Sequence, residues 1–518
     1  MAAQRSSTAS ASSSSSSLPL QPCVDESAFP TPEDFEQWVD KICCGGKLRM
    51  PGGETHKGAV EWLESELKSI EGLQVTSTEH DLRVWEPAKG ETLASCSSLA
   101  LGSKKVPIAS TIAYSLPTTV TAPLVYIPSG TPLTAENAAG KIVVRDTSFP
   151  RIWPYAFISL ISYFTTRDLP YFSRYKRPAT DDQAIEDMLV GSKIGVKGYI
   201  DVLDVPREYM EGHFTPHDGI FYKLPGIFVG CDEGAEIKKA AKAGKEATIT
   251  VRADVSESTT KNLTATLPGQ SSESILYVTH TDGCSHVQEN GPGALLALAK
   301  YFASVPLSLR TRTVQFVFNS GHLNLAREGS NFHSQALGKD LGSEVTLVVP
   351  IEHMAAREIE QYSRGFWTNG WGLKYTGKGE LMIWAVGPME PVIKAVREAV
   401  SRRKLDRVVV NRGACLPQSV VVPTYTSFGG LGTYYHTQLL PTTSIISGPW
   451  SLWSPYWGPK AVDYARMRSQ TLALGDLYFA LQDVKREEIV KPYTEYREEV
   501  TSGRKKQFVH YVPNPDVQ

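Results

Sequence analysis

The chain has 518 residues, which is more than one compact hydrophobic core accommodates, so at least two domains are expected. Hydrophobic residues make up 41% and charged residues 21%, as in ordinary globular proteins, and the formal net charge is -2. A near-neutral balance argues against a nucleic-acid partner, which calls for a basic surface. The seven cysteines form no CxxC pair, which argues against a disulfide framework and favours a reducing compartment.

Residues 1–30 are predicted to be disordered, because serine dominates the first part of this stretch and no apolar core of signal-peptide length occurs in it. The most apolar window elsewhere, residues 152–164, contains a proline and is too short to span a bilayer. We therefore expect a cytoplasmic protein without a membrane partner, and secretion remains open.

Residues 31–94 are predicted to form two helices and a strand. The stretch "TPEDFEQWVDKI" (31–42) has a threonine cap, a proline at the first helical position and acids in the first turn. "THKGAVEWLESELKSI" (55–70) repeats apolar residues at helical spacing, and "GLQVTSTEHDLRVW" (72–85) alternates like a strand.

Residues 95–255 have a different sequence pattern. Short β-rich runs such as "APLVYIP", "KIVVRD" and "GIFVG" are separated by turns rich in glycine and proline, with one helix in "EGAEIKKAAKAG". We expect a β-rich domain inserted into the chain. It would split the other domain into residues 31–94 and 256–518.

Residues 256–518 alternate between strands and helices, for example "SILYVTH", "GALLALAKYFASV", "TVQFVFNSG" and "EVTLVVPIEH", and they end in a long helix. This alternation predicts an α/β fold, with a mostly parallel sheet sandwiched between helices.

Polar residues follow the predicted strands of this sheet at the points where the strands end. Ligands of open α/β sheets bind at the carboxyl ends of the strands. Imidazole and carboxylate are ligands that suit zinc and similar divalent ions. The candidate residues are His280, Asp282, Glu289, His322, Glu352, His353 and His436. A single histidine after a strand is more often structural, and His213, His217, His286 and His333 are assigned no functional role, the first two as part of a surface loop.

The order of these stretches resembles the M28 family of zinc metallopeptidases, whose α/β domain is often interrupted by a protease-associated domain. The matching stretches are "GGKLRMPGGETHKGAVEWLESEL", "LPGIFVGCDEGAEIKKAAKAG", "NLTATLPGQSSESILYVTHTDG", "TVQFVFNSGHLNLAREGSNF" and "LLPTTSIISGP". The resemblance covers nearly all of residues 31–490 and implies that the insert is a protease-associated domain. It also implies one or two zinc ions.

The resemblance assigns roles residue by residue. His280 and Asp282 match the His-x-Asp motif, in which Asp282 would orient the histidine. Glu289 stands where the family has a metal-bridging Asp, and His322 and Glu352 stand at later ligand positions. His436 is the best match to the last ligand of the family, although its surrounding loop fits poorly. Metal ligands are therefore expected at His280, Glu289, His322, Glu352 and His436.

Gly321 stands where the family has the glutamate that serves as general base. A glycine cannot accept a proton, so another group would have to do so. His353 is the first choice because the unperturbed pKa of histidine lies near neutrality, and Asp282, Glu328 and Glu352 are the alternatives.

These observations favour a metal-dependent hydrolase that acts on an amide, peptide or related acyl bond of a peptide or small-molecule substrate. Two alternatives stay open. One is a cyclising acyl-transfer enzyme on the same fold, like glutaminyl cyclase, and the other is a metal-free binding protein. Aromatic residues near the last predicted site, such as Trp450 and Trp453, are either packing residues or a pocket wall for an apolar substrate.

Overall fold

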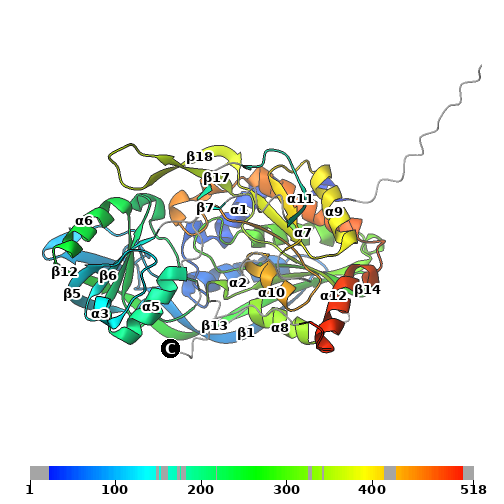
Figure 1. Cartoon of the computed structure of the whole chain (residues 1–518). Coiled ribbons are helices and arrows are strands. Elements are labelled where there is room, and N and C mark those ends of the chain that lie inside the picture. Colours follow the sequence, from blue (N-terminus) through cyan, green and yellow to red (C-terminus); the bar gives the residue numbers. More distant parts are fainter. Residues whose placement is uncertain are drawn as a thin grey trace, which may run out of the picture.

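The computed structural model describes residues 23–147, 151–152, 161–171, 175–176, 182–217, 219–324, 330–340, 344–413 and 428–505. These residues form two lobes that lie side by side (Figure 1). The larger lobe contains both the N-terminal helices and the C-terminal half of the chain, and the smaller lobe contains most of the insert.

The chain enters the larger lobe through helix α1 (Pro32–Ile42), which begins where the sequence predicts it. Thr31 caps the helix by accepting a hydrogen bond from the backbone N–H of Asp34, and Asp34 accepts one from the N–H of Thr31 in return. Phe35 and Val39 lie on the buried face of this helix. Helix α2 (Glu54–Lys68) and strand β1 (Gln74–Pro87) follow.

The central sheet of the larger lobe has the order β1, β13, β15, β14, β16, with β13 at Ala253–Leu267, β14 at Ser271–His280, β15 at Arg312–Asn319 and β16 at Val345–Pro350. Strand β14 pairs in parallel with both β15 and β16, whereas β1, β13 and β15 are antiparallel to their neighbours on that side. Two parallel bridges, Val348 to Thr442 and Ile351 to Ile445, connect β16 to strand β21 (Thr443–Ser447).

The sheet continues beyond β21 with β19 (Met382–Val386), β20 (Val408–Asn411) and β8 (Ser162–Thr165). Only β19 and β20 pair in parallel there. The predicted α/β fold class is confirmed, and the parallel pairing is concentrated at the centre of the sheet. That centre is where the carboxyl ends of β14, β15 and β16 meet.

Helices cover both faces of this sheet. Because successive side chains of a strand point to opposite faces, alternate residues of β14 lie in two different hydrophobic cores. Tyr277 stacks on Phe302 of helix α7 (Gly291–Ser304), whereas Leu276 and Val278 belong to a second core with Tyr434 of helix α10 (Gly430–Thr437). Helix α7 packs with α1 and α11 (Tyr464–Ala480), and α11 packs with α9 (Glu390–Arg402). Helix α10 packs with α8 (Ser330–Asp340), and α12 (Arg486–Thr501) contacts β16.

The smaller lobe has its own sheet. Its strand order is β3 (Lys104–Val106), β2 (Ser97–Leu101), β12 (Glu246–Val251), β5 (Thr118–Tyr126), β6 (Ile142–Thr147), β10 (Gly198–Leu203), β11 (Gly226–Val229) and β4 (Ser110–Thr111). Helices α3 (Ala135–Ala138), α5 (Asp182–Ile194) and α6 (Cys231–Lys242) accompany it. Arg145 of β6 and Asp187 of α5 form a buried ion pair with an Nε–Oδ2 distance of 2.7 Å, which joins this sheet to its helix.

Each lobe is contacted by a segment from the part of the chain that forms the other lobe. Strand β8 belongs to the predicted insert of residues 95–255, but it pairs with β20 and thus joins the sheet of the larger lobe. The prediction that residues 95–255 form an inserted domain therefore does not hold for β8, which joins the sheet of the larger lobe. In the other direction, the hairpin of β17 (Arg357–Ser363) and β18 (Trp371–Gly379) reaches the insert, where the N–H of Trp371 donates to the carbonyl of Asp204 at 2.9 Å.

Within the described residues, none of the helices combines the length and the apolar character that crossing a membrane requires.

Candidate metal centre

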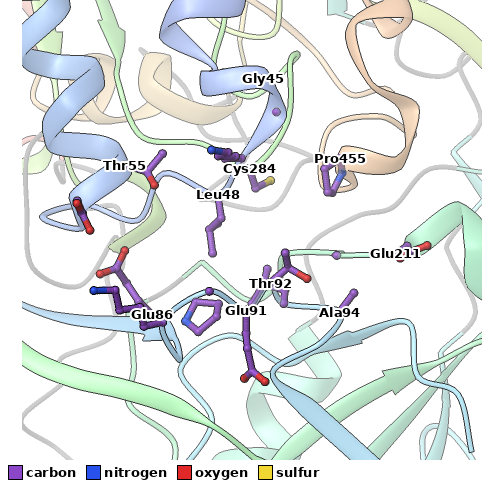
Figure 2. Close-up of a pocket in the computed structure, with 18 of the residues that line it drawn as sticks. Gly45, Leu48, Thr55, Glu86, Glu91, Thr92, Ala94, Glu211, Cys284 and Pro455 are labelled. Carbon is purple, nitrogen blue, oxygen red and sulfur yellow. The ribbon is translucent and has the colours of Figure 1, made fainter.

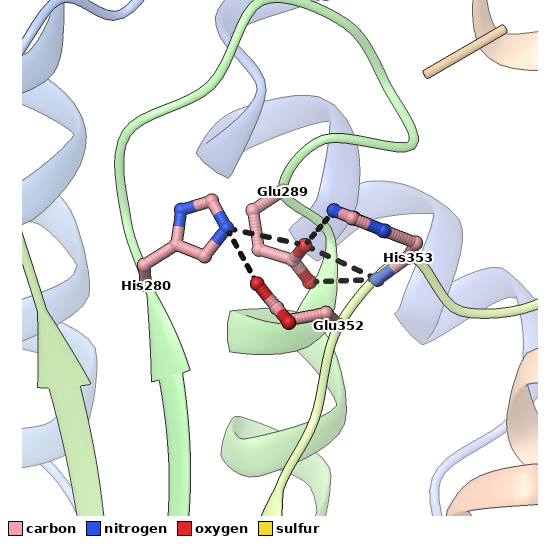
Figure 3. Close-up of side chains that lie close together, drawn as sticks. All are labelled: His280, Glu289, Glu352 and His353. Atoms are coloured by element: carbon pink, nitrogen blue, oxygen red, sulfur yellow. Dashed lines mark hydrogen bonds and ion pairs between the residues drawn. The ribbon is translucent and has the colours of Figure 1, made fainter. Parts of the chain in front are cut away.

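Four buried side chains converge at the carboxyl edge of the central sheet. His280, Glu289, Glu352 and His353 each offer one potential ligand atom, and these atoms all lie within 4.8 Å of one another. Figure 3 shows the four side chains pointing toward a common centre from three segments of the chain.

The parallel strands explain why these residues meet. His280 is the last residue of β14, and Glu352 and His353 follow β16, its parallel neighbour. Glu289 lies just before α7, at the end of the loop that leaves β14. Because β14 and β16 end at the same edge of the sheet, the residues that follow them lie side by side.

The orientation of His280 is set by a hydrogen bond on the far side of its ring. Nδ1 lies 2.8 Å from the backbone carbonyl of Asp282, so Nδ1 donates and the lone pair of Nε2 faces the centre of the cluster. Nε2 lies 3.4 Å from Oε1 of Glu352 and 3.6 Å from Oε2 of Glu289. Burial alone would lower the pKa of His280, but the neighbouring Asp282 and Glu352 raise it to about 10. A proton therefore competes with any cation for this ring.

The carboxylate of Asp282 is used by the backbone. It accepts hydrogen bonds from the N–H groups of Gly321, at 3.0 Å, and of Leu323. Burial opposes ionisation, but His280 holds the pKa of Asp282 well below its usual range. Asp282 therefore orients His280 through its backbone carbonyl and anchors the loop after β15 through its side chain.

Glu289 is held by backbone donors. Its Oε1 accepts from the N–H of Gly291 at 2.5 Å, and its Oε2 accepts from the N–H of His353 at 3.1 Å. Burial raises the pKa of Glu289 to about 8. A cation at the centre of the cluster would favour the ionised form of this carboxyl.

Glu352 and His353 are also fixed on one side and free on the other. Oε2 of Glu352 accepts from the N–H of Leu431, in the first turn of α10, at 2.8 Å. Nδ1 of His353 donates to the carbonyl of Ser447 at 2.9 Å, so its Nε2 faces Oε2 of Glu289 at 3.6 Å. The sequence assigned His353 as a general base, whereas the structure places its free nitrogen among the potential ligand atoms.

Three of these atoms are buried without a hydrogen-bonding partner in the described part of the chain: Nε2 of His280, Oε1 of Glu352 and Nε2 of His353. Buried polar atoms are normally satisfied, so three that face one centre form a group that could hold a cation. A tetrahedral zinc ion with bonds of about 2.0–2.1 Å separates its ligand atoms by roughly 3.4 Å. The separations of 3.4 Å between His280 and Glu352 and of 3.6 Å between His353 and Glu289 are close to that value.

His322 and a residue of the insert border the cluster. Nε2 of His322 lies 3.7 Å from Oε1 of Glu352, and its ring centroid is 4.2 Å from that of His280. The ring of His217 lies 5.6 Å from the ring of His322 and 4.8 Å from that of Trp453. His322 is thus close to the position predicted for it, but it is not one of the four.

The assignment of His213 and His217 to a surface loop is wrong. His213 is buried, and His217 forms part of the wall beside His322. Nothing in the spacing of the insert indicates that this loop reaches the other domain. Trp453, one of the aromatic residues considered as a pocket wall, does lie next to His217.

The structure does not bring His436 to the cluster. Nδ1 of His436 hydrogen-bonds the hydroxyl of Tyr493 at 2.9 Å, and its ring stacks on Phe428 at 3.8 Å. The first turn of α10 touches Glu352, but His436 lies six residues beyond Gly430, or about 9 Å along the helix axis. The ligand prediction for His436 is therefore corrected: the residue packs inside the lobe.

Gly321 cannot easily hold a general base. Its φ of +97° lies in the region that side chains of L-residues disfavour, and its N–H is bonded to Asp282. The backbone here thus disfavours the glutamate that the resemblance places at this position. Glu328, one of the alternative bases, lies outside the described residues.

A pocket of about 870 Å³ lies between the N-terminal segment, the insert and the turn near Pro455 (Figure 2). Cys284, from the loop that carries Asp282 and Glu289, reaches its wall, but none of the four cluster residues does. The pocket is a cleft that borders the loop of residues 281–289 from outside.

Comparisons with known proteins give a fold relationship. No protein-family model matches the chain, and no curated protein matches it significantly. Among solved structures, the zinc aminopeptidase of Bacillus subtilis matches with a TM-score of 0.58 and 14% identity, over 89% of this chain and 98% of its own.

Two further structures agree with it. An aminopeptidase from Aneurinibacillus sp. strain AM-1 matches with a TM-score of 0.54 and 16% identity, over 86% of this chain and 93% of its own. A Peptidase M28 precursor from Shewanella amazonensis SB2B matches with a TM-score of 0.56 and 15% identity, over 88% and 94%. The chain shares the fold of these two aminopeptidases and of the Peptidase M28 precursor, as the resemblance in sequence predicts.

Proposed function

We propose that this protein is a metal-dependent hydrolase that cleaves an amide, peptide or related acyl bond. The main observation in support is the buried cluster of His280, Glu289, Glu352 and His353. Three of its potential ligand atoms have no hydrogen-bonding partner among the described residues. The fold shared with zinc aminopeptidases supports the same class of reaction and favours peptide substrates.

The side chains of the cluster would hold one zinc ion, because nitrogen and oxygen donors at these separations suit it. A bound zinc ion supplies a water of lowered pKa and polarises a carbonyl. Asp282 keeps the His280 ring oriented, and the backbone N–H groups of Gly291 and His353 keep Glu289 in place. His322 and His217 border the site, so we expect a substrate to approach along them.

We also infer that residues 95–255, with the exception of β8, form a domain of the protease-associated type. Its contribution to the site is His217, whose ring lies against His322 and Trp453. A residue of the insert in the wall of the site would make substrate selection depend on both lobes.

Two observations favour a second candidate, a zinc-binding protein of this fold that does not hydrolyse its ligand. Gly321 provides no general base, whose loss typically lowers a rate about 10²–10⁴-fold. Four protein ligands would also occupy all coordination positions of a tetrahedral ion, whereas catalytic zinc sites usually keep one position for water. Zinc can expand to five ligands, which would restore room for the reacting water.

The test is to purify the protein, measure bound metal by elemental analysis and assay hydrolysis of aminoacyl anilides and a mixed peptide library. The hydrolase proposal predicts that the wild type hydrolyses a substrate, that a chelator abolishes this activity and that added zinc restores it. His280→Ala should have no activity. Bound zinc without turnover would support the second candidate. A protein that neither carries nor takes up a divalent metal would contradict both.

A further inference from the structure

Arg49 is a buried arginine whose donors go to backbone carbonyls rather than to a carboxylate. It lies between the 3-10 turn at Cys44–Gly46 and helix α2, and its side chain is 0% exposed. Nε points to the carbonyl of Thr281 at 3.4 Å, and Nη2 points to the carbonyl of Gln288 at 2.8 Å and toward that of Ser285 at 3.5 Å. Nη1 donates to the carbonyls of Cys43 and Lys47 at 3.0 and 3.3 Å.

The carbonyls of Thr281, Ser285 and Gln288 belong to the loop of residues 281–289, which we call the metal-site loop because it carries Asp282 and ends at Glu289. The loop closes on itself where the N–H of Cys284 donates to Gln288 at 3.0 Å. Its Gly283 also exchanges backbone hydrogen bonds with Arg49, at 2.7 and 3.3 Å. The guanidinium thus lies inside the turn that the loop makes.

The guanidinium of Arg49 is tightly packed. A Cβ atom added at Gly283 would lie 2.2 Å from Nη2 of Arg49 and 2.1 Å from the carbonyl oxygen of Gln288. His56 of α2 supports the start of the loop in the same way, because its Nε2 lies 2.8 Å from the hydroxyl of Thr281. The N-terminal segment therefore holds the loop both from inside and from one end.

A buried cation without an ionic partner is costly, and a hydrophobic side chain of similar size would fill the same space. What a hydrophobic side chain could not do is satisfy carbonyls that converge from several directions. A planar guanidinium with five donors in fixed directions can.

We propose that Arg49 is a positioning residue, which holds the metal-site loop in its metal-binding conformation before the ion arrives. This inference rests on the proposed metal centre. Without Arg49, the carbonyls of Thr281 and Ser285 would lose their guanidinium donors, and the carbonyl of Gln288 would keep only the N–H groups of Cys284 and Ser285. The loop would then open toward water. Opening would separate Glu289 from His280, the pair whose ligand atoms lie 3.6 Å apart.

The chain offers a control in Arg312. It is 5% exposed, and it donates to the carbonyls of Leu481, at 2.5 Å, and Val484, while its Nε pairs with Oε2 of Glu273 at 2.9 Å. Arg312 is the first residue of β15, so it lies at the edge of the sheet opposite the carboxyl ends that form the metal centre. An Arg→Lys change at either position keeps the charge and removes the planar fork.

The experiment compares the wild type, Arg49→Lys and Arg312→Lys. Zinc affinity is measured by competition with a chromophoric chelator, and thermal unfolding is measured on the metal-free proteins. We expect Arg49→Lys to bind zinc about 10–100-fold more weakly, the usual cost of removing a group that supports a ligand. We expect Arg312→Lys to bind zinc like the wild type, even where its metal-free form is equally destabilised.

An Arg49→Lys protein with wild-type zinc affinity would overturn the inference while leaving the metal centre intact. A wild-type protein that binds no zinc would overturn the proposed function itself, and this inference with it. Hydrogen exchange of the metal-free wild type tests the same idea without a variant. The amides of Gly283 to Gln288 should be protected before zinc is added, and free exchange that zinc alone suppresses would overturn the role of Arg49.

Discussion

Glu352→Gln tests the metal centre with a small change in shape. The substituted side chain keeps an amide oxygen that can accept the hydrogen bond from the N–H of Leu431. It removes the negative charge that lies 3.4 Å from Nε2 of His280 and 3.7 Å from Nε2 of His322. The fold of the loop after β16 should therefore survive, while the centre loses one of its two carboxylate donors.

The expected magnitude follows from the position of Glu352 as a direct donor. Removing a group that merely supports a ligand costs about 10–100-fold in metal affinity, so losing a direct donor should cost at least about 100-fold. Zinc at 100 times the wild-type Kd stabilises the folded protein by about 2.7 kcal/mol, and the same concentration would stabilise the variant by only about 0.4 kcal/mol. The entropy of unfolding is about 2.1 cal/mol/K per residue, which for 518 residues gives about 1.1 kcal/mol/K and hence about 1 °C per kcal/mol. The zinc-induced rise in Tm should therefore fall from roughly 2–3 °C to below about 0.5 °C.

The assay is thermal unfolding with and without zinc, and Glu358→Gln is the control. Glu358 is a buried glutamate of β17 that pairs with Arg407, outside the metal centre. The control should lower the Tm of the metal-free protein and leave the zinc-induced rise unchanged. An undiminished zinc effect in Glu352→Gln would refute the assignment of Glu352 as a donor.

Two further predictions concern histidines outside the cluster. His436→Asn should lower stability by about 1–3 kcal/mol, because it removes the stacking on Phe428 and alters the contact with Tyr493, and it should leave zinc affinity unchanged in the competition assay. A loss of zinc binding in this variant would restore His436 as a ligand. Burial lowers the pKa of His213 to about 3, so between about pH 6.5 and pH 3 the unfolded chain binds a proton that the folded protein does not. The wild type should therefore lose up to about 1.4 kcal/mol per pH unit from this group as the pH falls, and His213→Gln should lose less in urea titrations at stepped pH. Equal slopes for the two proteins would contradict the role of His213.

The alternation of strands and helices was enough to predict the α/β class, because each strand carries a continuous apolar run and each helix an apolar stripe. The same patterns place His280 and Glu352 at strand ends, and parallel pairing then brings them together. The patterns were insufficient for β8, a short strand whose partner β20 is far away in the sequence. Pairing between strands that are far apart in the sequence produces no recognisable pattern in the local sequence of either strand.

The candidate site was predictable only to the extent that it follows strand ends. His353 was identified as functional, but its orientation depends on the carbonyl of Ser447, a contact that no spacing predicts. His436 was misplaced because a histidine near a strand was matched by order alone, whereas the residue lies in the last turn of helix α10. Arg49 and His217 approach the metal-site loop and His322 through tertiary packing, for which a single sequence has no signal.

The central claim is that His280, Glu289, Glu352 and His353 hold one divalent ion. X-ray absorption at the zinc edge of the zinc-loaded wild type tests it most directly, since Cys43 and Cys284 lie in or against the metal-site loop and offer a sulfur alternative. The account predicts one zinc per chain with a first shell of nitrogen and oxygen only, at about 2.0–2.2 Å, and the outer-shell scattering of imidazole rings. A sulfur shell at about 2.3 Å, or a spectrum of hydrated zinc, would contradict it.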